Sequence, residues 1–326
     1  MRALITGVSG FAGSHLADFL LQQGLEVWGV ANTGLGAASH LEGQVSYRSL
    51  DLRDPAAVYP FLKACQPARI YHLAAQAFVP ASWKDPWPTL ETNIRSELNL
   101  LQGIVDLKLD ARILCVSSGE IYGKISSEML PVDEQTPLSP DSPYGVSKVA
   151  QDLLAAQYYL SNEVYAVRAR PFNHIGPRQN ERFVAPEFAR QIAEIEAGRS
   201  DPVMLVGNLE AQRDFSDVRD MVRAYYLLLE QGAPGEAYNI GRGEPHSVRE
   251  LLEGLLSFST LEIDVQTDPA RFRPSDVPVS YADISKIRTA TGWEPRISFR
   301  ESLGDVLGDW RERVKRDTRY GMRDAR

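Results

Sequence analysis

A glycine-rich segment near the N-terminus, Gly7-Val8-Ser9-Gly10-Phe11-Ala12-Gly13, constrains the fold more than any other feature of this sequence. It follows an apolar strand predicted at 4–6 and opens a helix predicted at 14–23. In a dinucleotide-binding loop of this kind, glycines permit the tight turn, the approach of the backbone to a pyrophosphate, and helix–sheet packing. The segment therefore predicts a dinucleotide site at a helix N-terminus, with an ordinary turn as the alternative. The expected cofactor contacts are Gly7, Gly10, Phe11, Ala12 and Gly13.

Strand-like and helix-like patterns alternate through the first half of the chain. Strands are predicted at 4–6, 25–30, 45–50, 69–73, 112–116 and 164–168, and helices at 14–23, from 54 onward, 88–107 and 143–160. The strands are rich in Val, Ile and Leu rather than alternating with polar residues, as a sheet covered on both faces requires. This rhythm predicts an α/β fold of the Rossmann type, with a doubly wound parallel sheet.

The rhythm breaks after Pro177, where the pattern becomes mixed and shorter-ranged. Helices are predicted at 183–197, 217–231 and from 247 onward, and strands at 203–206 and 237–240. We expect residues 1–172 to form the NAD(P)-binding domain, with segments near 214–241 returning to it. The remainder, 173–326, is expected to form a smaller mixed α/β substrate domain.

Composition narrows the class of protein. The 43 acidic residues outnumber the 35 basic ones, and no basic stripe precedes the C-terminus, which argues against nucleic-acid binding. No apolar run approaches about 18 residues and no signal peptide is recognisable, so we expect a cytoplasmic protein without a membrane span. Of the two cysteines, Cys65 and Cys115, the second lies in an apolar run and reads as a buried thiol. No clustered His and Cys residues suggest a metal site.

The ends of the next strands leave the choice of cofactor open. The second strand is followed by Asn32. This position has neither the acidic residue that binds the ribose of NAD nor an arginine that would bind the 2′-phosphate of NADP. Asp51 and Leu52, after the third strand, are placed to meet the adenine ring, although a simple turn aspartate fits the spacing equally well. The fourth strand ends in Leu73, Ala74 and Ala75, where the chain is expected to pass close to the cofactor.

A second motif, Tyr144-Gly145-Val146-Ser147-Lys148, carries acid–base chemistry. Tyr144 and Lys148 stand four residues apart, so they share one face of the helix predicted at 143–160. An ammonium group beside a phenol stabilises the phenolate and lowers its pKa from about 10 toward neutrality. Tyr144 then becomes a usable general acid or base at a carbinol carbon. The spacing often occurs by chance, but Ser118 just beyond a strand end could bind the same substrate oxygen, and we predict a Ser118–Tyr144–Lys148 triad.

These elements, in this order, resemble the extended short-chain dehydrogenase/reductase family over nearly the whole chain. Within that family the chain is most similar to the branch of GDP-4-keto-6-deoxy-D-mannose reductases and GDP-mannose 4,6-dehydratases. The strings that carry the resemblance lie at 170–177, 206–211, 213–220 and 273–277. The resemblance implies NADP or NAD as cofactor, with the preference unresolved, and a GDP-sugar as substrate.

The resemblance also implies roles for residues in the second half. The loop at 170–177 resembles the one around the nicotinamide and the sugar, and the positions matching Arg213 and Arg273 hold the diphosphate and ribose side of the nucleotide. A guanidinium fork suits this task because it binds phosphate oxygens bidentately, whereas the alternative for each is an exposed loop cation. The implied cofactor contacts here are Tyr144, Lys148 and Pro171. The implied substrate contacts are Ser118, Tyr144, Asn173, Val184, Arg213, Arg273 and Asp276.

Glu120 bears on the choice between two reactions. Both transfer hydride at C4, but a dehydratase must also remove the C5 proton and expel the C6 hydroxyl, which needs a further carboxyl group. Glu120 stands where dehydratases carry their catalytic glutamate, so it is a candidate catalytic residue. The strings around Asn173 and Phe215 look more like those of the reductases, and Glu187 lies near the position where dehydratases tend to carry lysine.

We therefore predict reduction of GDP-4-keto-6-deoxy-D-mannose to GDP-D-rhamnose by NAD(P)H. The alternatives are a GDP-mannose 4,6-dehydratase, another nucleotide-sugar epimerase or reductase, and a non-catalytic nucleotide-sensing module. In the family, the helices that correspond to 88–107 and 143–160 pair across a twofold axis, so a homodimer is expected. Core packing within one chain is the competing explanation for their apolar faces.

Overall fold

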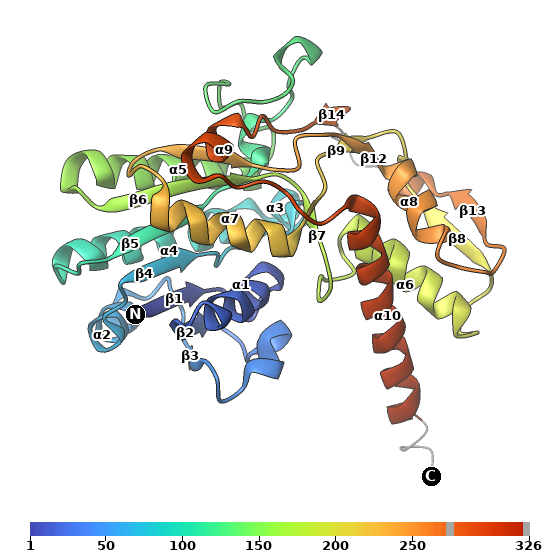
Figure 1. Ribbon diagram of the computed structural model, residues 1–326, viewed down its shortest axis with the longest axis horizontal. Coiled ribbons are helices and arrows are strands. Elements are labelled where there is room, and N and C mark those ends of the chain that lie inside the picture. Colours follow the sequence, from blue (N-terminus) through green and yellow to red (C-terminus); the bar gives the residue numbers. More distant parts are fainter. Residues whose placement is uncertain (272–276, 322–326) are drawn as a thin grey trace.

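The computed structural model describes residues 1–271 and 277–321 (Figure 1). Within these ranges the largest unit is a seven-stranded sheet with the strand order β11-β6-β5-β4-β1-β2-β3, in which every pair of neighbours is parallel. Its strands are β1 (Arg2–Thr6), β2 (Glu26–Ala31), β3 (Ser46–Ser49), β4 (Arg69–His72), β5 (Arg112–Val116), β6 (Tyr165–Pro171) and β11 (Ala237–Ile240). The chain winds outward from β1 to β3 and then crosses to β4 on the other side of β1. This is the doubly wound Rossmann arrangement that the sequence predicts.

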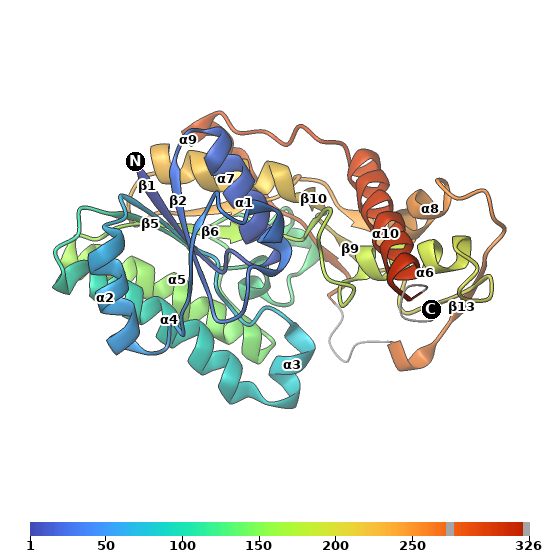
Figure 2. The same cartoon turned by 90° about the horizontal axis from the view of Figure 1, so that it is seen from below.

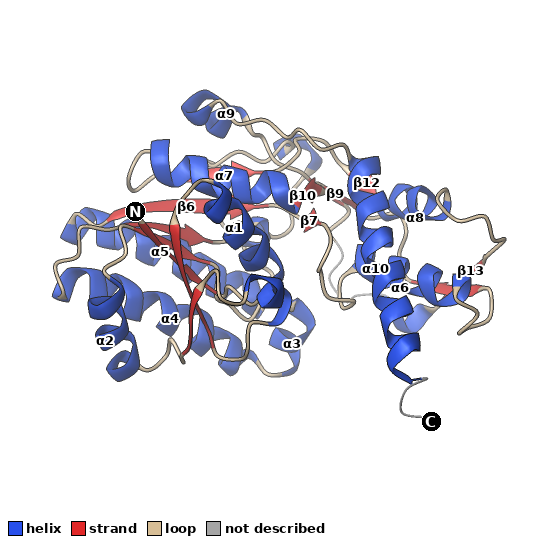
Figure 3. Cartoon of the chain, turned by 60° about the horizontal axis from the view of Figure 1, so that its bottom comes forward, coloured by secondary structure: helices blue, strands red, loops and turns tan. Residues whose placement is uncertain are grey.

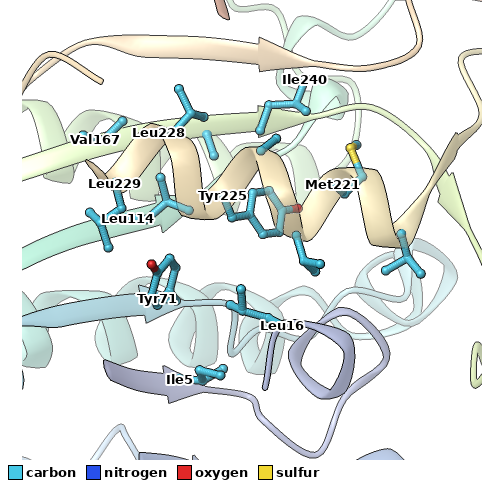
Figure 4. Packing of buried hydrophobic residues seen from close by; sticks show 14 of the residues in the cluster. Ile5, Leu16, Tyr71, Leu114, Val167, Met221, Tyr225, Leu228, Leu229 and Ile240 are labelled. Atoms are coloured by element: carbon cyan, nitrogen blue, oxygen red, sulfur yellow. The ribbon is translucent and has the colours of Figure 1, made fainter. Parts of the chain in front are cut away.

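Helices cover both faces of the sheet (Figure 2). On one face lie α2 (Pro55–Cys65), α4 (Pro86–Asp106) and α5 (Pro143–Asn162), and on the other α1 (Phe11–Gln22) and α7 (Val218–Gln231). Successive residues of β5 show the consequence, because Ile113 packs into the core under the first layer and Leu114 into the core under the second. Figure 4 shows the second core, in which Tyr71 and Leu114 of the sheet face Tyr225 of α7. Burial on both faces explains why central strands such as β1 and β5 are rich in apolar residues, whereas the edge strand β3 is polar and largely exposed.

A smaller mixed unit lies beside the sheet (Figure 3). It contains α6 (Val184–Glu196), α8 (Val248–Leu256) and α10 (Phe299–Gly321), together with the strand pair β8 (Val203–Val206) and β13 (Asp264–Thr267). Its own core gathers Phe188 of α6, Leu252 of α8 and Leu307 of α10. Two further small sheets join distant segments: β7 (His174–Ile175) with β10 (Ser216–Asp217), and β9 (Gln212–Arg213) with β12 (His246–Ser247) and β14 (Val279–Ser280).

Local sequence signals set several element boundaries. The Asp54 side chain accepts a hydrogen bond from Ala56 N at 3.0 Å, which caps α2 as expected. Ser247 and Glu250 form the predicted capping box at the start of α8. The first helix begins at Phe11, three residues earlier than predicted, because the glycine-rich loop passes directly into it.

Cys65 and Cys115 are both buried free thiols. None of the helices in the described residues is long and apolar enough to cross a membrane.

Candidate functional site

The glycine-rich loop lies between β1 and α1, against the end of β4. Gly7 has a φ of +76°, a conformation that side chains disfavour, and its N–H donates to the Val30 carbonyl oxygen at 2.8 Å. A Cβ atom on Gly7 would lie 3.0 Å from Ala74 Cα, so the loop and the end of β4 are in direct contact. Gly10 caps α1 without any side-chain hydrogen bond, which leaves the first N–H groups of the helix, near Phe11 and Ala12, able to bind a pyrophosphate. The loop therefore fits the dinucleotide that the sequence predicts.

The residues expected around the adenosine lie beyond the ends of β2, β3 and β4. Asn32 is exposed just after β2, and Leu52 is buried after β3. The Asp51 carboxylate pairs with Arg53 at 2.7 Å, and that hydrogen-bonded guanidinium keeps the pKa of Asp51 below its ordinary value. Asp51 thus stays ionised. It also accepts a hydrogen bond from Arg53 N at 2.9 Å, the local contact of a turn aspartate. The half-buried segment 73–75 follows β4, next to the glycine-rich loop.

The predicted triad is assembled at the N-terminus of α5. The Ser142 hydroxyl caps this helix by accepting from Gly145 N at 3.0 Å, and Ser82 Oγ of α3 (Val79–Lys84) accepts from Tyr144 N at 3.2 Å. These two contacts fix the first turn, which carries Tyr144. Ser118 follows β5 and caps the short 3-10 helix η2 (Gly119–Tyr122), and its hydroxyl hydrogen-bonds to the Tyr144 phenol.

Lys148 lies one turn further along α5 and is almost fully buried. Its Nζ donates to the Val116 carbonyl oxygen at 2.8 Å, which ties it to the end of β5. The same Nζ lies 6.0 Å from the centroid of the Tyr144 ring. Ser118, Tyr144 and Lys148, which are separated by up to 30 positions in the sequence, therefore meet at one point.

The electrostatics of Tyr144 differ from the sequence-based expectation. Burial raises the pKa of its phenol above the ordinary value, and the nearby charge of Glu120 raises that pKa further, while the hydrogen bond from Ser118 lowers it. The expected lowering by Lys148 does not dominate, because the ammonium group is directed at the Val116 carbonyl oxygen rather than at the phenol oxygen. Tyr144 is accordingly a protonated group at neutral pH, suited to donating a proton.

The residues expected at the substrate lie on three further segments. Asn173 is exposed between β6 and β7, and its carbonyl oxygen accepts from Ser216 N at 3.0 Å. Val184 is the first residue of α6, and Pro171 is the last residue of β6. The Arg213 guanidinium is half-buried and donates to the carbonyl oxygens of Gln212 and Val277, at 2.8 and 2.6 Å. Arg273 and Asp276 lie outside the described residues.

A cavity of about 1120 Å³ on the outer side of the glycine-rich loop could not be predicted from the sequence. It lies between α1, the 3-10 helix η1 (Gly36–Leu41) and α10, and Arg178 is prominent in its lining. Arg178 has a φ of +70°; its N–H donates to Asp309 of α10 at 2.8 Å and its guanidinium to Asp18 of α1 at 2.7 Å. The only signal for this residue was its place directly after Gly176-Pro177, because its partners lie 131 and 160 positions away.

Comparison with known proteins agrees with the fold and places the chain in a family. Residues 4–306 match the family model described as GDP-mannose 4,6 dehydratase. The chain is 35% identical to the GDP-6-deoxy-D-mannose reductase of Pseudomonas aeruginosa, over 97% of this chain and 99% of that protein. It is 30% identical to the human GDP-mannose 4,6 dehydratase, over 94% and 90% of the two chains.

Solved structures of related enzymes are similar to this chain in fold and in sequence. The structure of RMD from Pseudomonas aeruginosa complexed with NADPH has a TM-score of 0.84 and 34% identity, covering 96% of this chain and 99% of that chain. The UDP-glucose 4-epimerase of Thermus thermophilus in complex with NAD has a TM-score of 0.86 and 30% identity, covering 95% and 99%.

The Rossmann sheet and the full-length likeness to these enzymes define an NAD(P)-dependent nucleotide-sugar enzyme of the extended short-chain dehydrogenase/reductase class. Within that class, the chain belongs to the GDP-mannose 4,6-dehydratase family, which its similarity to both the reductase and the dehydratases supports.

Proposed function

We propose that this protein is an NAD(P)H-dependent reductase that converts the C4 keto group of GDP-4-keto-6-deoxy-D-mannose to the alcohol of GDP-D-rhamnose. The observation that carries the proposal is the meeting of Ser118, Tyr144 and Lys148 beside the β5 end, in a chain alignable along its full length with a GDP-6-deoxy-D-mannose reductase. A non-catalytic nucleotide-sensing module would not need this buried acid–base group.

The residues take separate roles in the proposed reaction. The loop from Gly7 to Gly13 holds the dinucleotide, with Asn32, Asp51, Leu52, Pro171 and the segment 73–75 as further proposed contacts. When bound, the reduced cofactor supplies the hydride for C4. Tyr144 donates its phenolic proton to O4 as negative charge develops there, and Ser118 orients that oxygen by hydrogen bonding. Lys148 stabilises the resulting phenolate by its charge and is the proposed contact for the nicotinamide ribose.

A dehydratase is the second candidate, because a specific residue favours it. Glu120 is half-buried on η2, and its charge acts on Tyr144, so a carboxylate is close to the reacting group. The matching family model also bears the dehydratase description. In the reductase, we assign Glu120 to positioning the substrate rather than to removing a proton.

The substrate side is proposed to bind the nucleotide through two arginines, Arg213 and Arg273, with Asn173, Val184 and Asp276 as further contacts. We take residues 173–326 as the substrate domain that supplies them. Loss of one charge-assisted phosphate contact costs roughly 1.5–3 kcal/mol, so Arg213→Ala should weaken nucleotide binding by roughly ten- to a hundredfold. Calorimetry with GDP, UDP and dTDP separates the substrate assignment from the fold, since tighter binding of UDP or dTDP contradicts a GDP-sugar.

A homodimer and a cytoplasmic location are part of the proposal. Leu98 of α4 and Leu153 and Leu160 of α5 are exposed on adjacent helices, which supports pairing through this face. Fractionation of the producing cells checks the location.

The reaction is tested by mixing the purified protein with GDP-4-keto-6-deoxy-D-mannose and NADPH or NADH. We expect one equivalent of reduced cofactor to be consumed per keto sugar, and NMR of the product to identify GDP-D-rhamnose. Cofactor consumption that yields the C4 epimer would keep the reductase and change its product, whereas no consumption contradicts the proposed reaction.

A further inference from the structure

A fully buried carboxylate lies beneath the catalytic site and has no part in the proposed reaction. Glu97 of α4 has an exposed fraction of 0%. Its Oε2 accepts from Nε2 of Gln151 at 2.8 Å and lies 3.9 Å from Nε2 of His72, at the end of β4. Its other oxygen, Oε1, has no hydrogen-bond partner among the described residues. Burying a carboxylate in this way is costly unless a charge or hydrogen bonds compensate, so its presence calls for a cause.

The fold places Glu97 and Lys148 at the same level of the sheet. Helices α4 and α5 pack side by side (Figure 2). Asn93 Nδ2, one turn before Glu97, donates to Ser147 Oγ at 2.9 Å. Gln151, which binds Glu97, lies three residues after Lys148 and so on the same face of α5.

Strand β5 connects the two groups as well. Its last residue, Val116, accepts the hydrogen bond from Lys148 Nζ, and the preceding residue, Cys115, hydrogen-bonds through its thiol to Glu97. Glu97 and Lys148 therefore flank one end of β5.

Among the described residues, Glu120 is a further carboxylate whose charge acts on Tyr144, and the remaining titratable groups around Glu97 and Lys148 carry no free negative charge. The Asp152 carboxylate is held by Arg168 at 2.7 Å and by Arg170 at 2.8 Å. Burial lowers the pKa of His72 to about 3 and raises the pKa of the Cys115 thiol well above its ordinary value, so both are neutral near pH 7. Tyr144, on the same helix, is neutral for the same reason.

Burial lowers the pKa of Lys148 from its ordinary value, and the charge of Glu97 is the first influence that opposes this. In return, burial raises the pKa of Glu97 from its ordinary value to about 8, and the charge of Lys148 is the first influence that opposes this rise. Each group thus stabilises the charged form of the other.

We propose that Glu97 is a positioning residue that keeps the Lys148 ammonium group charged at the catalytic site, acting through the buried cluster that joins α4 and α5 to β4 and β5. The inference rests on the proposed reductase only where activity is the readout. A purely structural role, in which Glu97 serves only as a hydrogen-bond partner of Gln151, is the competing interpretation, and it predicts no change in the titration of Lys148.

The first test is the pH profile of kcat/KM for Glu97→Gln, which keeps the shape of the side chain and removes its charge. Loss of a compensating charge at close range shifts a pKa by roughly 1–3 units, so the activity of the variant should fall away at correspondingly lower pH than that of the wild type. The variant should recover much of its activity below that range, where Lys148 is again protonated. Glu97→Asp, which retains a carboxylate, should restore part of the alkaline activity.

The matched control is Glu91→Gln, the same chemical change on the same helix at a position that pairs with Arg95 and Arg53. Its pH profile should coincide with that of the wild type. A uniform loss of activity in Glu97→Gln at every pH, or an unchanged profile, contradicts the proposal.

The second test is independent of the substrate. Lysine labelled with ¹³C at Cε reports the charge of each side chain by NMR, and the signal missing from Lys148→Arg identifies Lys148. We expect this signal in the wild type to titrate above pH 7 and in Glu97→Gln to titrate at lower pH. Titration below pH 7 in the wild type, or at the same pH in both proteins, overturns the role of Glu97 even if a variant folds poorly. If the wild type fails to reduce the keto sugar, the proposed function falls while this titration still decides the role of Glu97.

Discussion

A Cβ atom on Gly13 would lie 2.1 Å from the carbonyl oxygen of Gly7, so the first turn of α1 rests directly on the loop that enters it. No side chain fits this gap, because the obstructing atoms belong to the backbone. Gly13→Ala should therefore displace the loop, abolish measurable binding of NADPH, and lower the free energy of unfolding by about 1–3 kcal/mol.

Calorimetry with NADPH and chemical denaturation measure both effects. Gly308→Ala is the matched control, since a Cβ at that helical position meets nothing within 4 Å. It should bind NADPH normally. Normal binding by Gly13→Ala would show that the loop does not hold the cofactor.

The acid–base assignment separates Tyr144 from Glu120. Loss of a positioned proton donor typically costs roughly 10²–10⁴-fold in rate, so Tyr144→Phe should lose at least that much of kcat/KM on the keto sugar. Glu120→Gln should keep most of the activity, because the proposed reduction removes no proton from the sugar. Steady-state kinetics of both variants check this, with unaltered NADPH binding as evidence of an intact fold. A Glu120→Gln variant as inactive as Tyr144→Phe would favour the dehydratase.

The fold could be predicted largely because its signals are local. The strand at 112–116 is apolar from Ile113 onward, and Ile113 and Leu114 do enter opposite cores. The capping residues Asp54 and Ser247 likewise act within their own helices. The sheet that joins β9 to β12 and β14 could not be predicted, since each strand has only two residues and no periodicity reveals its partner.

The same contrast holds in the site. The positions of Tyr144 and Lys148 on one helix face follow from their spacing, but the pKa of Tyr144 depends on where the Lys148 ammonium group points, and that is set by Val116 of β5. From the sequence alone, Glu97 is indistinguishable from the other polar residues of an amphipathic helix. It is buried only because Gln151 and Cys115 are brought to it by other elements.

His15 makes stability depend on pH. Its side chain is 8% exposed, and its Nε2 donates to the Pro177 carbonyl oxygen at 2.9 Å. Burial, followed by the charge of Arg178, lowers the pKa of His15 from 6.5 to about 4. A folded-state pKa below the unfolded value stabilises the protein fully above pH 6.5, and this stabilisation, at most about 3 kcal/mol, is lost as the pH falls through 4.

His15→Gln keeps a donor for Pro177 but does not titrate. Its free energy of unfolding should therefore decrease less between pH 6.5 and 4 than that of the wild type, as measured by urea denaturation at several pH values. Gln22→Ala, on the exposed end of the same helix, controls for the substitution itself. Parallel pH dependence in His15→Gln and the wild type contradicts the role given to His15.

The proposed dimer predicts the mass of the wild-type protein in solution and a lower mass for a variant that cannot pair. Leu153 and Leu160 of α5 are 52% and 79% exposed, and in a twofold pairing they become buried. Light scattering should give twice the chain mass of 36.3 kDa for the wild type, and the mass of one chain for Leu153→Glu. Val203→Glu, at an exposed apolar position of β8 away from α4 and α5, should remain a dimer. A wild type that has the mass of one chain at micromolar concentration rules the dimer out.

The central claim, that the chain is a reductase and not a dehydratase, is tested most directly by incubating the purified protein with GDP-mannose and no added dinucleotide. A dehydratase regenerates its bound cofactor in each turnover, whereas a reductase consumes a reduced cofactor and needs a keto sugar. We predict that mass spectrometry finds GDP-mannose unchanged, while the same preparation oxidises NADPH once GDP-4-keto-6-deoxy-D-mannose is supplied. Formation of the 4-keto-6-deoxy product from GDP-mannose alone would contradict this account.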